Sequence, residues 1–293
     1  MRIKPLAFES LGTRSMCTFV ETNDIRILID PGVSLAPYRF GLPPHPVELK
    51  ALSDSWKLIL EYAERSDVLL ITHYHFDHFN PFEDTYIYEG KTVLVKDPKN
   101  NINFSQIKRS KFFLEKIKGL PGKLEIADGG SFNFGGTVVK FSPPVFHGSG
   151  SQLGYVLEVL VDDGYRLLYT SDVEGPIFPD QLNFILESTP HTVILDGPMT
   201  YMLGYRYSFD SFEKALKNII KIVEGDFLEN LIVDHHALRD LDWMIQLKPV
   251  FEAARSKGVR VLSAAEYAGQ PVNLLEARRR ELYELYPVND SHQ

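Results

Sequence analysis

The chain alternates short apolar runs with longer segments of amphipathic spacing. Residues 15–22 and 25–30 are apolar runs on either side of Asn23-Asp24, which predicts a hairpin of two strands. Residues 49–65 carry apolar side chains at helical spacing, and residues 68–72 form an all-apolar run, as expected of a strand buried on both faces. Further strands are expected at residues 92–95, 138–141 and 155–161.

From residue 166 onward, strands and helices alternate regularly. Expected strands cover residues 167–171, 192–196, 231–234 and 259–263, and expected helices cover residues 179–187, 210–223, 242–257 and about 273–286. Such alternation predicts β-α-β units, in which helices pack on a sheet. No repeat, low-complexity tract or linker divides the sequence. We therefore expect one α/β domain over residues 1–293, with the last helix near its C-terminal end.

Composition and charge narrow the class of protein. With 293 residues, 44% of them hydrophobic, the chain has ample material for a core. The formal charge of −8 argues against a protein that coats nucleic acid or anionic membranes. Cys17 is the single cysteine, the start of the chain lacks the apolar core of a signal peptide, and no apolar run approaches the 18 residues of a membrane span. We expect a cytoplasmic protein with no membrane partner, and the oligomeric state stays open.

Basic residues concentrate in residues 91–123. Nine lysines and arginines stand there against two acidic residues, which gives this segment a charge of +7. Such a concentration could attract phosphate. The alternative is the solvated face of a helix, on which Lys108, Lys111, Glu115 and Lys118 recur at helical spacing opposite Ile107, Leu114 and Ile117. We favour the solvated helix face.

Three histidines and an aspartate crowd one hexapeptide directly after the strand expected at residues 68–72. His73 and His75 are two residues apart, so on an extended segment they point the same way and can share one ion. Asp77 and His78 follow where the chain turns, within reach of a second ion. Imidazole and carboxylate ligands suit zinc, and less exclusively iron or manganese. Such a cluster is hard to satisfy without a cation.

The hexapeptide HYHFDH resembles the His-x-His-x-Asp-His signature of the metallo-β-lactamase superfamily of hydrolases, and the chain looks closest to an archaeal branch of it. The resemblance covers nearly the whole chain and implies a four-layered αββα sandwich with two divalent metal ions at one edge. His147 after PPVF and Asp172 after LLYTS match the family's later ligands. The last ligand is His235 or His236. We prefer His235 because LIVDH repeats the spacing of LLITH, which leaves His236 as a supporting group or proton donor.

The resemblance also implies which of these residues bind each metal ion and which take part in the reaction. One ion would take His73, His75 and His147, the other Asp77, His78 and His235, and Asp172 would bridge them. A hydroxide between the ions would attack the scissile carbonyl or phosphoryl group, with Asp77 available for its proton. Asp30 and Asp196 each end an apolar strand and are expected to orient metal-bound imidazoles, although helix capping or loop support would explain them too.

The substrate is less constrained. Two aromatic loops, residues 36–45 and 200–207, leave strands that should end near the metals, and they supply the expected substrate contacts Arg39, Tyr201, Tyr205 and Arg206. We expect an anionic small molecule or nucleic acid as substrate, cleaved at a phosphodiester. An ester, thioester or lactone is the alternative. A catalytically silent binding scaffold is a third hypothesis, against which the complete ligand set counts.

Overall fold

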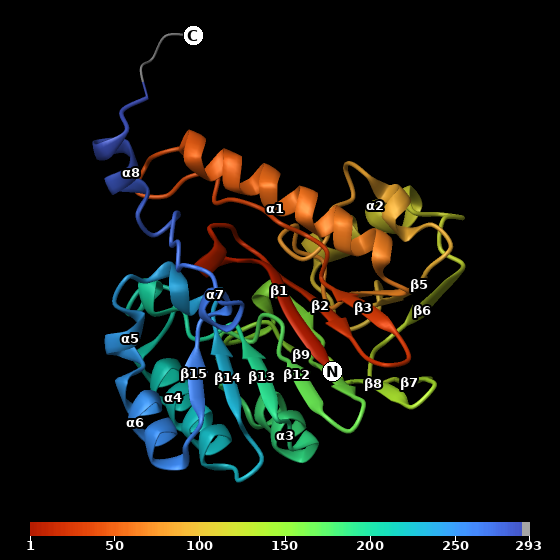
Figure 1. Ribbon diagram of the computed structural model, residues 1–293. Helices are drawn as coiled ribbons and strands as arrows, with labels where there is room; N and C mark the ends of the chain where they lie inside the picture. Colours follow the sequence, from red (N-terminus) through yellow and green to blue (C-terminus); the bar gives the residue numbers. More distant parts are fainter. Residues whose placement is uncertain (289–293) are drawn as a thin grey trace.

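The computed structural model describes residues 1–288 and shows two mixed sheets lying face to face between two layers of helices (Figure 1). The strand order of the first sheet is β1 (Arg2–Phe8), β2 (Met16–Glu21), β3 (Arg26–Ile29), β4 (Val68–Ile71), β5 (Thr92–Val95) and β6 (Lys123–Ile126). The order of the second is β15 (Arg260–Leu262), β14 (Asn230–Val233), β13 (Thr192–Leu195), β12 (Arg166–Tyr169), β11 (Val159–Asp162), β8 (Thr137–Phe141) and β7 (Ser131–Phe134). A small ribbon pairs β9 (Val145–Phe146) with β10 (Tyr155–Val156).

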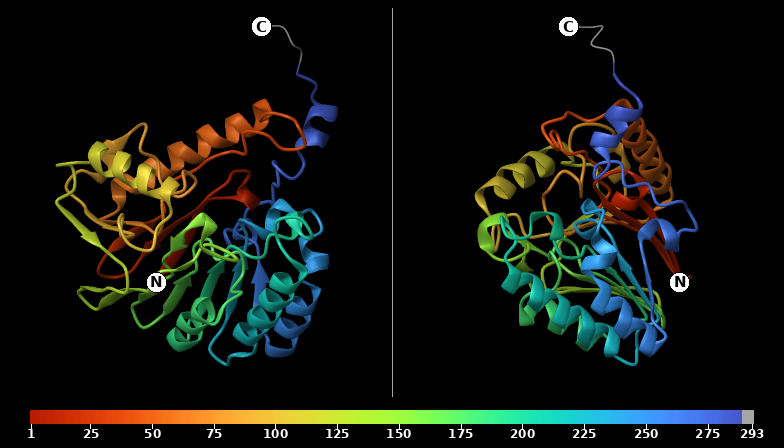
Figure 2. Two further views of the ribbon diagram at one scale, coloured as in Figure 1. Left: turned by 180° about the vertical axis from the view of Figure 1, so that it is seen from behind. Right: turned by 90° about the vertical axis from the view of Figure 1, so that its left-hand side faces the viewer.

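Helices cover the outer face of each sheet (Figure 2). The first sheet carries α1 (Pro46–Arg65) and α2 (Phe104–Lys116), and the second carries α3 (Pro179–Ser188), α4 (Phe209–Glu224) and α6 (Lys248–Lys257). The shorter helices are α5 (Trp243–Gln246), α7 (Ala264–Tyr267) and α8 (Arg279–Leu285), with 3₁₀ turns η1 (Glu9–Leu11), η2 (Thr85–Tyr88), η3 (Ser151–Leu153), η4 (Thr200–Met202) and η5 (Ala237–Arg239). This is the expected αββα sandwich.

The unbroken apolar runs of the central strands follow from burial on both faces. In β4, Leu70 points between the two sheets, whereas Leu69 and Ile71 pack beneath the helices of the first layer. In β14, Ile232 likewise faces the other sheet, and Leu231 packs toward the helices. Because successive side chains alternate, a strand covered on both faces needs an apolar residue at every position.

Most expected elements are present with ends shifted by at most three residues, but three expectations need correction. The helix expected at residues 242–257 is divided into α5 and α6 at Leu247, because Pro249 occupies the first turn of α6 and can donate no backbone hydrogen bond. The strand expected at residues 155–161 is divided into β10 and β11, which belong to different sheets. The helix expected at residues 273–286 begins only at Arg279.

The elements that were not expected are mostly edge strands. β1 contains Pro5 and an irregularity in its pairing with β2, and β6 and β7 leave alternate side chains exposed. The helix α7 has only four residues. Among residues 1–288, no helix has the length and apolar character needed to cross a membrane.

The C-terminal segment returns to the start of the chain and binds it through buried charges. Arg14 donates to both oxygens of Glu276, with N–O distances of 2.6 and 2.7 Å. The Arg279 guanidinium is fully buried and forms a salt bridge of 2.8 Å with Glu48 of α1. Figure 1 shows α8 beside the beginning of α1. Glu276 is held by Arg14, and Arg279 is held by Glu48. Residues 273–278 therefore run along the N-terminal part of the chain, and the helix begins only after them.

The Arg14–Glu276 pair should make stability depend on acid. Burial opposes ionisation, but the hydrogen bonds from Arg14 prevail and lower the pKa of Glu276 from 4.5 to about 2. A lowered pKa stabilises the fold at pH values above 4.5, and this contribution is lost as the pH falls toward 2. We expect Glu276→Gln to reduce the free energy of unfolding at pH 7 by roughly 2–3 kcal/mol.

Urea unfolding of both proteins at pH 7, 5, 4 and 3 measures this contribution. The difference between native protein and variant should shrink steadily below pH 4.5, because other acid-sensitive groups contribute equally to both proteins. A difference that stays constant down to pH 3 would contradict the assignment.

Candidate metal centre

The chemistry-bearing residues gather where parallel strands of both sheets end. β3 and β4 run parallel in the first sheet, and β12, β13 and β14 run parallel in the second. Asp30, His73, Asp172, Asp196 and His235 follow these strands within three residues. Since carboxyl ends of parallel strands meet at one edge, the two sheets bring these side chains together. A 2.7 Å hydrogen bond between the hydroxyls of Thr72 and Ser171 joins the sheets at this edge.

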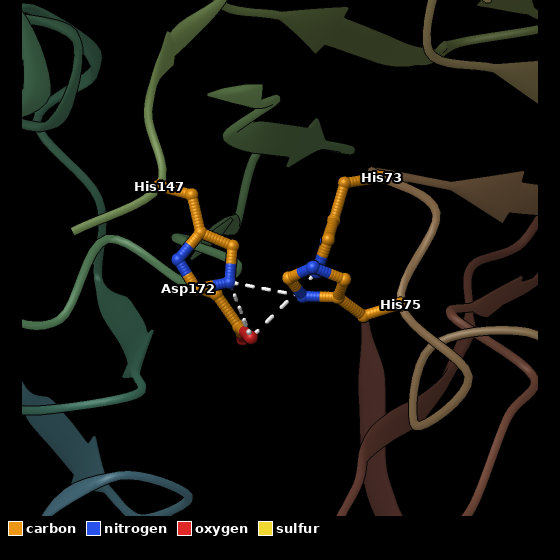
Figure 3. A group of neighbouring side chains, drawn as sticks. All are labelled: His73, His75, His147 and Asp172. Atoms are coloured by element: carbon orange, nitrogen blue, oxygen red, sulfur yellow. Dashed lines mark hydrogen bonds and ion pairs between the residues drawn. The ribbon is translucent and has the colours of Figure 1, made fainter. Parts of the chain in front are cut away.

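His73, His75, His147 and Asp172 form the first group (Figure 3), and one potential ligand atom from each lies within 4.8 Å of the others. His75 Nδ1 is 3.1 Å from His147 Nε2, which in turn is 3.3 Å from Asp172 Oδ2. Several lone-pair donors turned toward one point are the arrangement that a cation requires. The structure thus brings together the three histidines expected for one ion.

Asp77, His78 and His235 form the second group, again with ligand atoms within 4.8 Å of one another. Asp172 Oδ1 is 3.1 Å from His78 Nε2 and 3.5 Å from His235 Nε2. Its other oxygen, Oδ2, faces the first group. Asp172 therefore lies between the two groups with one carboxylate oxygen directed at each, which is the geometry of a bridging ligand.

Buried polar atoms at the centre lack partners of their own. His73 Nε2, His78 Nε2 and Asp172 Oδ1 have no hydrogen bond with any residue that the structure describes. Buried polar atoms without partners are rare, because each costs the free energy of its lost hydration. Divalent cations would satisfy all three atoms at once. The donor set therefore fits two divalent ions.

The electrostatics of the site divide its histidines into two sets. Although burial opposes it, the neighbouring carboxylates raise the pKa of His78 well above its usual value, that of His147 to about 10 and that of His235 to about 9, so metal binding at these three imidazoles would displace a proton. Burial, assisted by neighbouring imidazoles, lowers the pKa of His73 well below its usual value and that of His75 to about 3. Burial would raise the pKa of Asp172, but the surrounding histidines, His78 first, hold it well below its usual range. Neutral imidazoles and an ionised carboxylate are the forms that bind metal.

Carboxylates behind the histidines fix their orientation. Asp30 accepts a hydrogen bond from His78 Nδ1 at 2.8 Å and others from Thr72 and Tyr169, so His78 Nε2 is directed at Asp172. Asp196 accepts from His236 Nδ1, also at 2.8 Å. Asp30 thus contacts a histidine of the hexapeptide and Asp196 contacts His236, and their role in orienting metal-bound imidazoles stays a prediction.

Glu9 plays the same part for His235 and was not expected from the sequence. It lies in η1, directly after β1, and accepts from His235 Nδ1 and from Arg239 Nε, each at 2.7 Å. His235 Nε2 consequently faces Asp77 and Asp172, at 3.7 and 3.5 Å, and accepts a hydrogen bond of 3.0 Å from Arg239 Nη2. His236 also reaches Asp172, at 3.8 Å, and forms a further group with Asp172 and His235 whose ligand atoms lie within 4.8 Å of one another, although it is not in the group of Asp77, His78 and His235.

The backbone around the centre is held in the left-handed region at residues other than glycine. The φ angles are 49° for Asp30, 56° for Ser171, 56° for Glu174 and 40° for His235. Such conformations are uncommon for these residue types and persist where the surrounding contacts impose them. The sharp turns after β3, β12 and β14 keep these side chains at the edge of the sheets.

Gly32 allows the turn after β3 to pass directly over the hexapeptide. A Cβ atom here would lie 2.1 Å from Phe79 N and 2.5 Å from the carbonyl carbon of His78. Both are backbone atoms, so relief requires a shift of the segment that carries the histidines. We expect Gly32→Ala to destabilise the fold by about 3 kcal/mol and to weaken metal binding by about ten-fold or more.

Thermal unfolding and competition for metal with a chromophoric chelator measure these two effects. Gly136→Ala is the matched control, because its Cβ would meet only Asp24 Oδ2, at 3.4 Å. Equal behaviour of the two variants would mean that the close approach at Gly32 does not position the histidines.

The centre opens into a pocket of about 420 Å³ that exposes His75, Asp77, Asp172 and His236. Arg14, Arg109 and Arg239 also line it, although the sequence did not single them out as substrate contacts. Arg109 belongs to α2 in the basic segment, whose lysines 108 and 111 are exposed as expected of a solvated helix face.

An adjoining pocket of about 900 Å³ contains Tyr201, Tyr205 and Arg206, three of the expected substrate contacts. The fourth, Arg39, lines neither pocket. Its guanidinium stacks on Tyr201 at 4.8 Å and donates to the Arg239 carbonyl at 3.0 Å. Arg39 therefore packs the loop of residues 36–45 against the loop of residues 200–207.

Comparisons with known proteins agree with this geometry. A sequence profile of the metallo-beta-lactamase superfamily matches residues 12–80. A UPF0282 protein of Korarchaeum cryptofilum is 53% identical over 292 residues, covering 99% of this chain and 97% of its own length.

Solved structures show the same fold at low sequence identity. Yeast PDE1 matches with a TM-score of 0.54 at 15% identity, over 89% of this chain and 97% of its own. Isothiocyanate hydrolase from Delia radicum gut bacteria also gives a TM-score of 0.54, at 14% identity, over 86% of this chain and 95% of its own. The fold, the strand-end histidines and the near-complete archaeal match agree: this chain belongs to the UPF0282 family, within the metallo-β-lactamase superfamily.

Proposed function

We propose that the chain is a metal-dependent hydrolase that holds two divalent ions and cleaves a phosphodiester. The observation that carries this proposal is Asp172, whose two oxygens face two separate histidine groups at the floor of an arginine-lined pocket. The nitrogen-rich donor set suits zinc best, with iron or manganese as alternatives. When bound, such ions supply a nucleophile derived from water and polarise the scissile bond.

Two side chains of the pocket can move protons. Asp77 keeps part of its carboxylate exposed to the pocket, so its Oδ2 can accept a proton from the attacking water. His236 is fixed by Asp196 through Nδ1, which leaves Nε2 free to take up a proton and pass it to the leaving group. These two roles rest on position, because both side chains line the pocket on which the histidine groups open.

The arginines favour an anionic substrate, and Arg109 is the one whose charge is available. Arg14 pairs with Glu276, and Arg239 pairs with Glu9. Arg109 has no carboxylate within 4.0 Å among residues 1–288, and its Nη1 donates only to the Tyr74 carbonyl, at 3.3 Å. A guanidinium that forms no salt bridge and lies beside the candidate metal centre is well placed to bind a phosphate oxygen.

The experiment is hydrolysis by the metal-loaded protein of a model phosphodiester beside a model thioester and a model lactone. Turnover of the phosphodiester alone is expected. Turnover of the acyl substrates alone would instead support the ester, thioester or lactone hydrolase. No turnover of any of the three with two ions bound would contradict the phosphodiester as substrate, and a purified protein that binds no metal would support the catalytically silent scaffold.

Removal of the Arg109 charge should weaken phosphodiester binding. A charge-assisted hydrogen bond contributes about 1.5–3 kcal/mol, so Arg109→Met is expected to raise KM about 10- to 100-fold. Lys108→Met is the matched control, because Lys108 is the neighbouring cation on α2 but is exposed and lines neither pocket at the centre. Equal KM values for the two variants would assign Arg109 a structural role only.

A further inference from the structure

We infer that the substrate is amphiphilic: a phosphate ester whose second part is a hydrocarbon group, held in an apolar groove beside the metal centre. This inference rests on the proposed function for its phosphate part. The groove encloses about 320 Å³ and shares Ser34, Leu35 and Phe76 with the pocket of the metal centre. Because the two spaces share lining residues, one small molecule can occupy both.

The groove is built from three segments of the chain, residues 33–35, 44–52 and 76–82. Leu49 and Leu52 come from α1, and Phe76, Phe79 and Phe82 come from the segment that carries the metal-binding hexapeptide. Leu49 is 51% exposed and Phe82 is 60% exposed, although both are large apolar side chains. Exposed apolar side chains that line a concave surface next to a reaction centre indicate a ligand that covers them.

Charge and apolar surface meet at Phe76. The Arg109 guanidinium lies 4.7 Å from the centre of the Phe76 ring, which also packs against the rings of Phe82 at 5.0 Å and Phe79 at 5.6 Å. Arg109 therefore stands at the boundary between the groove and the pocket of the metal centre. A molecule with its phosphate at Arg109 and its ester group directed along Phe76 would place its apolar part between Phe82 and Leu49.

The polar groups of the groove do not suit a nucleobase. Among the lining residues within 1–288, only Ser34 and Asn80 have polar side chains. The Asn80 side-chain oxygen accepts from the Phe82 amide, and the Ser34 backbone is paired with that of Arg14. A base has several donors and acceptors that would be desolvated here with few partners, whereas a hydrocarbon group has none. The groove thus distinguishes an alkyl or aryl phosphate ester from a nucleotide.

Calorimetric titration of the metal-loaded protein tests this assignment without requiring turnover. The probes are methyl, butyl, hexyl and octyl phosphate, with adenosine monophosphate as the nucleotide. Each fully buried methylene improves affinity about four-fold, so octyl phosphate is expected to bind at least 100-fold more tightly than methyl phosphate. Leu49→Asn and Phe82→Asn should each reduce this ratio about ten-fold. Leu124→Asn is the matched control, because Leu124 is 46% exposed on β6 and does not line the groove.

The outcomes separate this inference from the proposed function. An octyl-to-methyl ratio near one, or adenosine monophosphate binding more tightly than octyl phosphate, overturns the inference, and phosphodiester turnover would still support the proposed function. A steep ratio that Leu49→Asn and Phe82→Asn reduce supports the hydrocarbon groove even in a protein that cleaves no phosphodiester. A ratio reduced equally by Leu124→Asn also overturns it.

Discussion

Asp172→Asn is expected to reduce phosphodiester turnover at least about 10³-fold and to lower the number of bound ions. Single carboxylates that support metal ligands already contribute 10- to 100-fold, and a residue that faces both ion sites should contribute more. Asparagine keeps the size of the side chain but replaces one oxygen with an amide nitrogen, which cannot bind a cation. The structure therefore predicts that one histidine group loses its shared carboxylate oxygen.

Turnover measured together with metal content by atomic emission tests this expectation. Asp162→Asn is the matched control, because Asp162 ends β11, and its carboxylate accepts a backbone hydrogen bond in the following turn. It should retain both ions and most of the activity. An Asp172→Asn protein with two ions and turnover within three-fold of the native protein would rule out the bridging role.

The hexapeptide could be recognised from sequence because its information is local. His73, His75 and His78 follow one buried strand, and strand geometry fixes their relative directions over a few residues. His147, Asp172 and His235 lie far along the chain but also follow apolar strands, so each carries the same local signal. The parallel arrangement of β4, β12 and β14 with their neighbours then brings His73, Asp172 and His235 to one edge, whereas His147 follows β9 of the small antiparallel ribbon.

The remaining parts of the site depend on contacts that no local pattern encodes. Glu9 reaches His235 across 226 residues, because β1 and β14 belong to different sheets that end at the same edge. In the sequence, Arg109 cannot be distinguished from the other cations of an amphipathic helix. Only the packing of α2 places it in the lining of the pocket. The edge strands β6 and β7 are half exposed, so their sequences lack the continuous apolar run that revealed β4.

Arg279→Met should cause the largest loss of stability among the substitutions considered. Arg279 and Glu48 are both fully buried, and removal of one partner leaves an unpaired buried charge, which costs about 3–5 kcal/mol. The Arg279 guanidinium also donates to the carbonyls of Leu42 and Ala36, each at 3.0 Å, in the loop that carries Arg39. The variant therefore removes the counter-charge of Glu48 and also the donors that bind the carbonyls of the loop at residues 36–45.

Urea unfolding at pH 7 measures the decrease in the free energy of unfolding, and two further variants test its physical cause. Lys50→Met removes an exposed ion pair with Asp54 on the same helix as Glu48, and should change the free energy of unfolding by less than about 0.5 kcal/mol. The double variant Arg279→Met/Glu48→Leu should recover part of the loss, since no unpaired charge remains buried. A single-variant loss below about 1 kcal/mol would show that water reaches Glu48 once Arg279 is gone. If the single variant loses the full amount of about 3–5 kcal/mol and the double variant recovers none of it, the loss comes from the unpaired carbonyls of Leu42 and Ala36. The C-terminal segment would then stabilise the loop of residues 36–45 through these two hydrogen bonds.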